Sequence, residues 1–412
     1  MSQLNAGWVG LRLRRLRGAI GSLCSAVGIR RPGVQPRAPT LSRPTTAREV
    51  QEQALRCLPL LILDMTVSPL EIEVVACAAA PYGLTEDMKF FINGQPFDEF
   101  EFPIVDSELQ AKFFAVPWAG TKVRARATTN LRSLSSAPFF RIDASPTGAF
   151  VPSNWRQAMT IPNPKHERFA LPPAANMRRV VGDDSPIRFT LGGSTTFHNV
   201  GAYLAELGHA WSEYPRILDW GCGAGRITRY LLAETQAAVH GVDIDPENIA
   251  WCKSALTTGS FDCISPIPPT SFPDEYFDLI IGCSVLTHLS EDMQMAWLAE
   301  LQRIARPNAL LFLSVTGPTQ FAYNGLPHQL FRMIEEKGFV DLAHDPSLDT
   351  VINDSDYYRS ALHSRRYIVK EWSRYFQVVS IVDAIAAPQD FVVLRRRDKP
   401  VAPTTMPGNR SQ

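Results

Sequence analysis

The sequence predicts an α/β protein in which a doubly wound, mostly parallel sheet is preceded by a small β-sandwich domain. Three observations lead to this fold class. Short strand-like runs separated by turn residues fill residues 58–143, strands and helices alternate from residue 189 onward, and a glycine-rich loop follows the strand-like stretch RILDW. At 412 residues with 45% hydrophobic content, the chain is long enough for two hydrophobic cores.

The first segment of the chain is strongly basic. Residues 1–48 contain nine arginines and no Asp, Glu or Lys, and residues 8–20 (WVGLRLRRLRGAI) show an amphipathic helical pattern. Such a start is typical of an organelle transit peptide or of a helix on a membrane surface, and a disordered basic tail is the alternative. We expect residues 1–57 to be a proline-containing arm, largely disordered or an amphipathic helix, and residues 398–412 to be a disordered tail.

The charge of the whole chain is balanced, with 41 basic and 41 acidic side chains. The arginine-rich arm leaves 32 basic against 41 acidic side chains in the rest of the chain. A neutral to acidic body does not favour binding to nucleic acid, so we expect no nucleic-acid partner. No apolar run approaches the roughly 18 residues that a membrane span needs, so we expect no transmembrane segment.

The seven cysteines are widely spaced and form no CxxC or Cys/His metal pattern. An odd number of unpatterned cysteines is typical of reduced thiols in a cytoplasmic protein. We therefore expect a cytoplasmic location and no metal site.

Residues 58–143 contain six or seven apolar or alternating runs, such as LLILDMTV and KVRARATTN. Asn93-Gly94, between two apolar runs, is a strong signal for a hairpin. Short strands at this density are typical of a β-sandwich. No residue cluster in this domain carries chemistry, and the proline-rich residues 144–188 are interpreted as a connector.

Residues 189–397 begin with a helical pattern and continue with strands that alternate with helices. The stretch RILDW is the first of these strands. Asp245-Pro246, after the second strand, predicts a helix start with Asp245 as its N-cap. The alternation implies a parallel, doubly wound sheet, in which ligands bind at the carboxyl ends of the strands.

Gly221, Gly223 and Gly225 occupy every second position in the loop after RILDW. Glycine contributes no side chain to a core, so a ligand that approaches the backbone is the simplest reason for three of them. A dinucleotide-binding fingerprint needs G-x-G-x-x-G, but Arg226 occupies the third glycine position. The spacing disfavours a pyrophosphate-binding loop and therefore a dehydrogenase.

The stretch DWGCGAG resembles motif I of the class I S-adenosylmethionine (SAM)-dependent methyltransferases, an acidic residue followed after one position by GxGxG. The resemblance implies SAM as the cofactor and a Rossmann-like, mostly parallel sheet of seven strands with an antiparallel last strand. It also implies that Asp219 positions the amino-acid end of SAM; the alternative is a carboxylate that only satisfies loop amides. The loop residues that would lie against the methionyl part of SAM are Gly221, Cys222, Gly223 and Gly225.

The next strand carries a second motif of the same family. VHGVDID contains Asp243, and the resemblance implies that its carboxylate accepts both ribose hydroxyls while Ile244 packs against the adenine. The third strand is less informative. Asp262, in SFDCI, is a candidate for contact with the adenine amino group, and a surface turn is the alternative.

The run GCSVLTHL followed by WLAELQRIARPNALLFLSVTG resembles a conserved run of one methyltransferase subgroup, with an SVxTHL-type motif after the fourth strand. The resemblance places Ser284 and His288 at the carboxyl edge of the sheet beside the sulfonium. There His288 would accept a proton from a substrate hydroxyl. The alternative is a histidine that orients the loop or lines the cofactor pocket. Thr316 stands where the subgroup often has histidine.

Residues 318–375 form an insertion before the closing strands, and YYRSALHSRRYIVKEWSRYF resembles the substrate-side cap of the same subgroup. Its aromatic and histidine residues suit a sugar or another polar ring, with His363 as a second candidate catalytic residue. Tyr358 and Trp372 are equally well explained as core anchors.

These patterns predict a SAM-dependent methyltransferase that acts on a small-molecule or carbohydrate (glycan) acceptor, at oxygen. The alternative is a catalytically silent binding or scaffold protein with a methyltransferase fold, which would use the β-sandwich to contact a partner or glycan.

Overall fold

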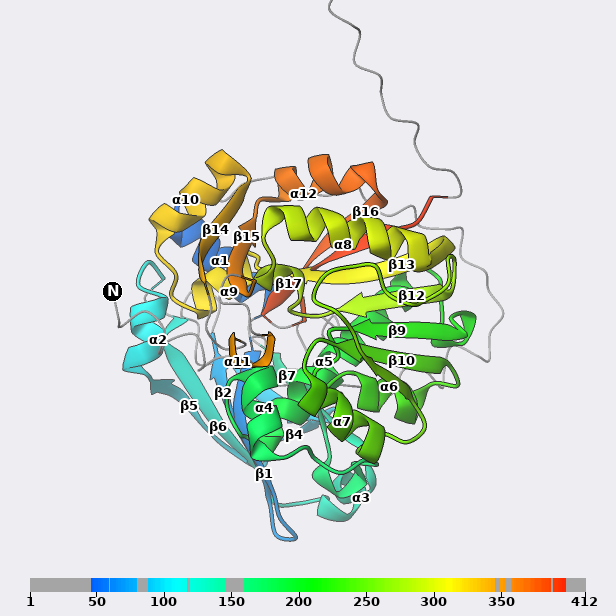
Figure 1. The fold of residues 1–412 in the computed structure, drawn as a ribbon. Coiled ribbons are helices and arrows are strands. Elements are labelled where there is room, and N and C mark those ends of the chain that lie inside the picture. The colour runs from blue at the N-terminus through cyan, green and yellow to red at the C-terminus, as the bar shows by residue number, and fades with distance from the viewer. Residues whose placement is uncertain are drawn as a thin grey trace, which may run out of the picture.

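The computed structural model describes residues 46–58, 60–79, 88–116, 119–145, 159–344, 349–352, 357–386 and 388–397. The amphipathic pattern at residues 8–20 and the tail at 398–412 lie outside these residues. The described part forms an N-terminal β-rich region, an α/β domain and a cap (Figure 1).

The N-terminal region consists of two antiparallel four-stranded sheets, in the orders β1-β2-β6-β5 and β4-β3-β7-β8. Buried side chains from both sheets, among them Leu60, Phe90 and Phe140, pack in one shared hydrophobic core. The strands are β1 (Leu60–Val67), β2 (Ile72–Ala78), β3 (Lys89–Ile92), β4 (Gln95–Pro96), β5 (Glu99–Val105), β6 (Thr121–Ala127), β7 (Phe139–Ser145) and β8 (Met159–Pro162).

The hairpin predicted at Asn93-Gly94 is confirmed. Ile92 pairs with Gln95 across this turn, and both turn residues have positive φ, 49° and 78°. Strand β8 falls beyond residue 143, so the second sheet extends into the segment that we interpreted as a connector.

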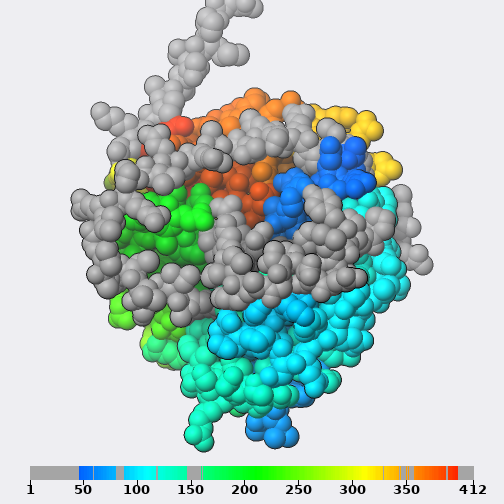
Figure 2. Space-filling view, turned by 180° about the vertical axis from the view of Figure 1, so that it is seen from behind, coloured from blue at the N-terminus to red at the C-terminus, as the bar shows by residue number. Residues whose placement is uncertain are grey.

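Helix α1 (Ala47–Cys57) occupies the end of the segment that we expected to be an arm. A capping box between Thr46 and Glu49 starts the helix. Its Val50 packs with Phe321 and Phe331 of the cap. Figure 2 shows α1, in dark blue, between the cap and the first sheet. The two short helices of this region are α2 (Ser107–Lys112) and α3 (Leu131–Ser136).

The α/β domain is built on a seven-stranded sheet with the order β11-β10-β9-β12-β13-β17-β16. The first five strands are parallel, and β17 runs antiparallel to both of its neighbours. The central strands are buried on both faces, which explains their continuous apolar sequences. The strands are β9 (Arg216–Trp220), β10 (Ala238–Asp243), β11 (Ser260–Cys263), β12 (Phe277–Gly282), β13 (Ala305–Val315), β16 (Gln377–Ala386) and β17 (Gln389–Arg395).

Helices cover both faces of this sheet, with α8 and α12 on one face and α6 and α7 on the other in Figure 1. The predicted N-cap of α7 is confirmed, because the Asp245 carboxylate accepts from the amides of Glu247 and Asn248. The helices of this domain are α4 (Ala174–Val181), α5 (Pro186–Glu206), α6 (Thr228–Glu234), α7 (Pro246–Ala255), α8 (Glu291–Ile304) and α12 (Arg365–Glu371), with the short 3₁₀ turns η4 (Pro164–His166), η5 (Trp211–Glu213), η6 (Leu286–His288) and η8 (Trp372–Arg374).

The cap follows β13 and lies between the carboxyl end of that strand and the N-terminal sheets (Figure 1). Tyr323 joins the two parts, because its buried hydroxyl donates to the carbonyl of Leu58 at 2.6 Å. Trp372 is fully buried in the core of the α/β domain, as the core-anchor interpretation expected. The cap elements are α9 (Pro318–Tyr323), α10 (His328–Lys337), β14 (Phe339–His344), α11 (Asp349–Ile352) and β15 (Arg359–His363).

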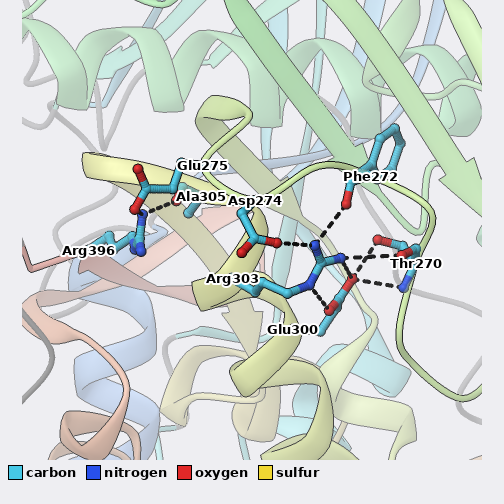
Figure 3. Close-up of polar contacts among 8 residues, drawn as sticks. All are labelled: Thr270, Phe272, Asp274, Glu275, Glu300, Arg303, Ala305 and Arg396. Atoms are coloured by element: carbon cyan, nitrogen blue, oxygen red, sulfur yellow. Dashed lines mark hydrogen bonds and ion pairs between the residues drawn. The ribbon is translucent and has the colours of Figure 1, made fainter.

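The long loop between β11 and β12 is fixed to the end of α8 by Arg303 (Figure 3). The Arg303 guanidinium donates to both oxygens of Glu300, at 2.8 and 2.7 Å, and to Asp274 at 2.6 Å. It also donates to the carbonyls of Phe272 and Thr270. Arg303 therefore ties Thr270, Phe272 and Asp274 of the loop that leads into β12 to the end of α8.

Candidate functional site

The glycine loop adopts a backbone that other residues rarely adopt. Gly221, Gly223 and Gly225 have φ of 72°, 54° and 78°. A Cβ at Gly221 would lie 2.3 Å from Cγ2 of Val285, and one at Gly223 would lie 2.7 Å from Cγ2 of Val180. The loop therefore needs glycine for both its conformation and its packing.

The loop is bonded to the end of the neighbouring strand. The amides of Gly221 and Cys222 both donate to the carbonyl of Val242, at 2.8 and 3.0 Å. The Asp243 carboxylate accepts from the amide of Gly223 at 2.7 Å and from the amide of Asp245 at 2.9 Å. Burial raises the pKa of Asp243 to about 6, although these amide bonds favour the carboxylate.

Asp219 lies at the end of β9 and is buried. Its carboxylate accepts from the Thr228 hydroxyl at 2.6 Å. Burial raises the pKa of Asp219 to about 6, and the Thr228 hydrogen bond and the Arg226 charge oppose this shift. Two carboxyl groups with raised pKa thus end adjacent strands, which is typical of functional sites.

A cavity of about 940 Å³, its solvent-filled mouth included, lies at the carboxyl ends of β9, β10 and β12. This is the place where open α/β sheets bind ligands. The predicted site residues that line it are Asp219, Gly221, Cys222, Gly223, Asp243, Ile244 and Ser284. The predicted site residues that do not line it are Gly225, Asp262, His288 and His363.

Ser284 forms part of the wall with an unusual backbone, at a φ of 63°. Its amide donates to the Ser314 hydroxyl at 2.6 Å, and its own hydroxyl donates to the Gln389 side chain at 3.0 Å. The neighbouring strands β13 and β17 therefore hold this non-glycine residue in a strained conformation.

Gly225 and Asp262 do not line the cavity, although we expected both residues to contact the cofactor. A Cβ at Gly225 would lie 2.3 Å from Cδ1 of Leu256, so this glycine allows close packing with the end of α7. The Asp262 side chain is 61% exposed, with Lys253 at 3.9 Å. Side chains alternate along β11, and Phe261 takes the buried position, so Asp262 points to solvent. Ile264 lines the cavity in its place.

His288 is buried beside the cavity rather than in its wall. Its Nδ1 donates to the carbonyl of Arg359 at 3.1 Å, and its ring stacks on Tyr358 at 4.2 Å between centroids. Tyr358 lines the cavity. This geometry favours the orienting alternative for His288, which holds Tyr358 against the site.

His363 is the last residue of strand β15 in the cap and is buried. Its Nε2 lies 2.8 Å from Oε1 of Gln294, and burial lowers its pKa to about 3. A group with this pKa is a weak base at neutral pH, so the geometry does not favour the catalytic role that we expected for His363.

Two arginines and two tyrosines also line the cavity. The arginines were missed in the sequence, whereas Tyr357 and Tyr358 belong to the aromatic residues of the cap that we expected on the substrate side. Arg226 is 9% exposed and donates to the Cys283 sulfur at 3.5 Å. Arg179 of α4 pairs with Asp245 at 2.8 Å, and Tyr357 and Tyr358 enter from the cap. For Arg226 a signal was present, because the paired glycines at 192–193 in α5 provide the space beside it. The long sequence separation of Arg179 from the glycine loop gave no such signal.

The sheet order, the glycine loop after β9 and the carboxylate that ends β10 form the arrangement that the sequence motifs of class I methyltransferases predict. In agreement, residues 218–313, from β9 to β13, match the protein family described as "Methyltransferase domain". S-adenosylmethionine is the cofactor that this family match supports. Within the described residues no group of three or more His, Cys, Asp or Glu side chains is arranged to hold a metal ion.

Solved structures also resemble this chain. A SAM-dependent methyltransferase from Methanosarcina mazei is 22% identical, with 45% of this chain and 93% of that chain covered and a TM-score of 0.32. A SAM-dependent methyltransferase from Clostridium acetobutylicum is 13% identical, with 52% and 96% covered and a TM-score of 0.36. The 1,6-didemethyltoxoflavin-N1-methyltransferase of Burkholderia thailandensis, with bound 1,6-didemethyltoxoflavin and S-adenosylhomocysteine, is 18% identical, with 50% and 80% covered and a TM-score of 0.34. At these identities and TM-scores the likenesses carry no argument about the acceptor.

Proposed function

We propose that the protein transfers a methyl group from SAM to a hydroxyl oxygen of a small-molecule or glycan acceptor. One observation carries the proposal: Asp219 and Asp243, at the ends of adjacent parallel strands, line a single cavity with the bare backbone of the glycine loop between them. A nucleoside with an amino-acid tail has a diol at one end and charged groups at the other, which this arrangement complements.

The residues present fit this cofactor. Both Asp243 oxygens already accept one backbone amide each, and each has a second lone pair for a ribose hydroxyl. Ile244 would pack on the adenine. Arg226 and the loop amides would bind the carboxylate of the amino-acid tail, and Asp219 would attract its ammonium group.

The bound cofactor supplies a methyl group on a positively charged sulfonium. The protein's own contribution is then to orient the acceptor, which supplies about 7 to 11 kcal/mol in favourable cases. The acceptor oxygen would take the methyl group as its bond to sulfur breaks, and the hydroxyl proton would pass to water. Tyr358, held by His288, would help to align the acceptor.

The N-terminal sheets and the cysteines bear on the rest of the proposal. We interpret the two sheets as a β-sandwich that supports the cap through Tyr323.

The cysteines of the described residues are free thiols, which supports a cytoplasmic location. Among the described residues no helix is both long and apolar enough to cross a membrane. Contact between the basic arm and a membrane surface stays a prediction.

Two measurements test the function. Calorimetric titration of the purified protein with SAM should give micromolar affinity, and incubation with labelled SAM and a cell extract should place label in a small molecule or glycan. SAM binding without any transfer would support the alternative of a silent scaffold protein. Absence of SAM binding would overturn the proposal.

A further inference from the structure

Helix α4 packs on the glycine loop and lies beside the start of α7 (Figure 1). Its Val180 lies next to Gly223, where a Cβ would come within 2.7 Å of the valine side chain. Met177 and Val181 of the same helix pack in one apolar cluster with Ala224 of the loop. Residues of α4 therefore border the cavity at the glycine loop.

The contacts between α4 and the first turn of α7 are polar. Arg179 forms ion pairs with Asp245 at 2.8 Å and with Glu247 at 2.6 Å. About one turn earlier in α4, Nδ2 of Asn176 donates to Oδ1 of Asn248 at 2.9 Å. Arg179 and Asn248 both line the glycine-loop cavity, so this junction of two helices forms part of the cavity wall.

Asn248 has a hydrogen-bond donor to spare at this wall. Its side-chain amide carries one acceptor oxygen and one NH₂ group, and Asn176 already donates to the oxygen. Within the described part of the chain, Nδ2 of Asn248 has no hydrogen-bond partner. The residue is only 4% exposed, and a buried N–H group without a partner is costly. The side chain is therefore suited to a ligand atom that accepts a hydrogen bond.

The position of Asn248 relates this donor to the proposed ribose site. The Asp243 carboxylate accepts from the Asp245 amide at 2.9 Å, and the Asp245 carboxylate accepts from the Asn248 amide at 3.3 Å. Two hydrogen bonds thus connect the acid that ends β10 to the first turn of α7, and all three residues line the cavity. A donor at Asn248 therefore belongs to the ribose end of a bound nucleoside.

The acceptor atoms of adenosine differ in their position relative to the ribose. N3 of adenine lies on the sugar side of the base, whereas N1 and N7 lie on its other edges. The ribose hydroxyls are the proposed donors to Asp243, and a carboxylate cannot donate to N3. N3 is thus the base acceptor nearest the ribose, and it needs a donor such as an amide N–H.

We propose that Asn248 is a cofactor-binding residue whose side-chain N–H donates to N3 of the adenine ring, and that Asn176 of α4 is the positioning residue that orients it. The assignment rests on the proposed function. It gives the protein a side-chain contact that distinguishes adenine from a base without an acceptor at this position. The competing explanation is a purely structural one, in which Asn248 only joins α7 to α4.

S-adenosylhomocysteine and its 3-deaza analogue form a matched pair of probes, because the analogue has a C–H group in place of N3. Calorimetric titration of the wild-type protein should show about three- to tenfold tighter binding of S-adenosylhomocysteine. In Asn248→Leu, which keeps the approximate shape of the side chain, this ratio of affinities should fall to about one. Asn199→Leu is the matched control and should keep the wild-type ratio, because Asn199 is a buried amide outside the cavity that donates to the carbonyl of Ile385.

The ratio separates a contact with the base from an effect on folding. A structural role alone would weaken both probes equally in Asn248→Leu. A wild-type ratio near one, or the same ratio in wild type and Asn248→Leu, would overturn the inference and leave the proposed function intact. Thermal unfolding checks that each variant folds, and the wild-type ratio tests the contact even if a variant does not.

Asn176→Leu tests the positioning role. This variant keeps Nδ2 of Asn248 but removes the contact that orients it, so the ratio should fall only part of the way to one. A wild-type ratio in Asn176→Leu would refute the role of Asn176. If the wild-type protein binds neither SAM nor S-adenosylhomocysteine, the proposed function fails and the inference fails with it.

Discussion

The Asp243 carboxylate accepts a hydrogen bond from the Gly223 amide at 2.7 Å, so the acid that ends β10 and the glycine loop that follows β9 form one bonded unit. Two motifs that are separate in the sequence thus share a hydrogen bond in the fold. Any ligand that bonds to Asp243 also contacts the group that holds the loop in place.

Asp243→Asn should lower SAM affinity about 100-fold or more. The variant replaces two charge-assisted acceptors for the ribose hydroxyls, each of which contributes about 1.5 to 3 kcal/mol. Calorimetric titration measures the effect. Asp262→Asn is the matched control, because Asp262 lies on the neighbouring strand with an exposed carboxylate outside the cavity. Equal losses in the two variants would contradict the assigned ribose site.

Gly221→Ala should destabilise the fold by about 2 to 4 kcal/mol and weaken SAM binding. Alanine at positive φ costs about 1 kcal/mol, and its Cβ would also meet Val285 at 2.3 Å. Gly208→Ala separates the two effects, because Gly208 has a φ of 82° with no atom within 4 Å of the added Cβ. The control should lose only about 1 kcal/mol in urea unfolding and bind SAM normally. A control as damaging as Gly221→Ala would show that packing at the loop is unimportant.

The local parts of the site could be predicted from the sequence. The alternating glycines Gly221 and Gly223 indicate a loop whose backbone must lack side chains, and Asp243 indicates an acidic residue at the end of the next strand. Both features can be recognised from the residues next to them in the sequence. Asp262 shows the limit of this reasoning. The four-residue strand β11 has too little pattern to fix its register, and a shift of one residue turns a side chain from the cavity to solvent.

The distant parts of the site could not be predicted in this way. Asn176 meets Asn248 only because α4 folds onto the start of α7. The protonation of His363 depends on Gln294, a residue of α8 whose own amide is fixed by two carbonyls. No periodicity or motif reports such contacts, so the sequence alone suggested a catalytic histidine where the structure has a buried neutral one.

The stability of the protein should depend on pH through Asp219. Burial raises its pKa from an ordinary 3.8 to about 6, so the folded protein binds this proton more tightly than the unfolded chain. The protonation of Asp219 therefore makes its full contribution to the free energy of unfolding below about pH 3.8, and this contribution is lost as the pH rises through about 6. Relative to Asp219→Asn, wild type should therefore lose on the order of 2 kcal/mol of unfolding free energy between pH 4 and pH 7. Urea unfolding of both proteins at several pH values measures this difference; a wild type that gains on the variant with rising pH would contradict the assignment.

Arg303→Met should destabilise the fold by about 2 to 3 kcal/mol, because it leaves the buried Glu300 without its charge partner. Arg306→Met is a suitable control, since Arg306 is 44% exposed and its ion pair with Asp278 should contribute less than about 1 kcal/mol. Urea unfolding compares the two variants.

The Arg303 variant should also weaken SAM binding by a smaller factor. The loop that Arg303 holds includes Pro266, whose carbonyl accepts from the Trp297 indole at 3.1 Å and the Tyr357 hydroxyl at 2.6 Å. Both of these side chains line the cavity of the proposed SAM site. If the loop is less ordered, the Trp297 and Tyr357 side chains lose a fixed hydrogen-bond partner. Calorimetric titration should therefore show severalfold weaker SAM affinity for Arg303→Met and unchanged SAM affinity for Arg306→Met. Unchanged affinity in a destabilised Arg303→Met protein would show that the loop supports the fold alone and not the site.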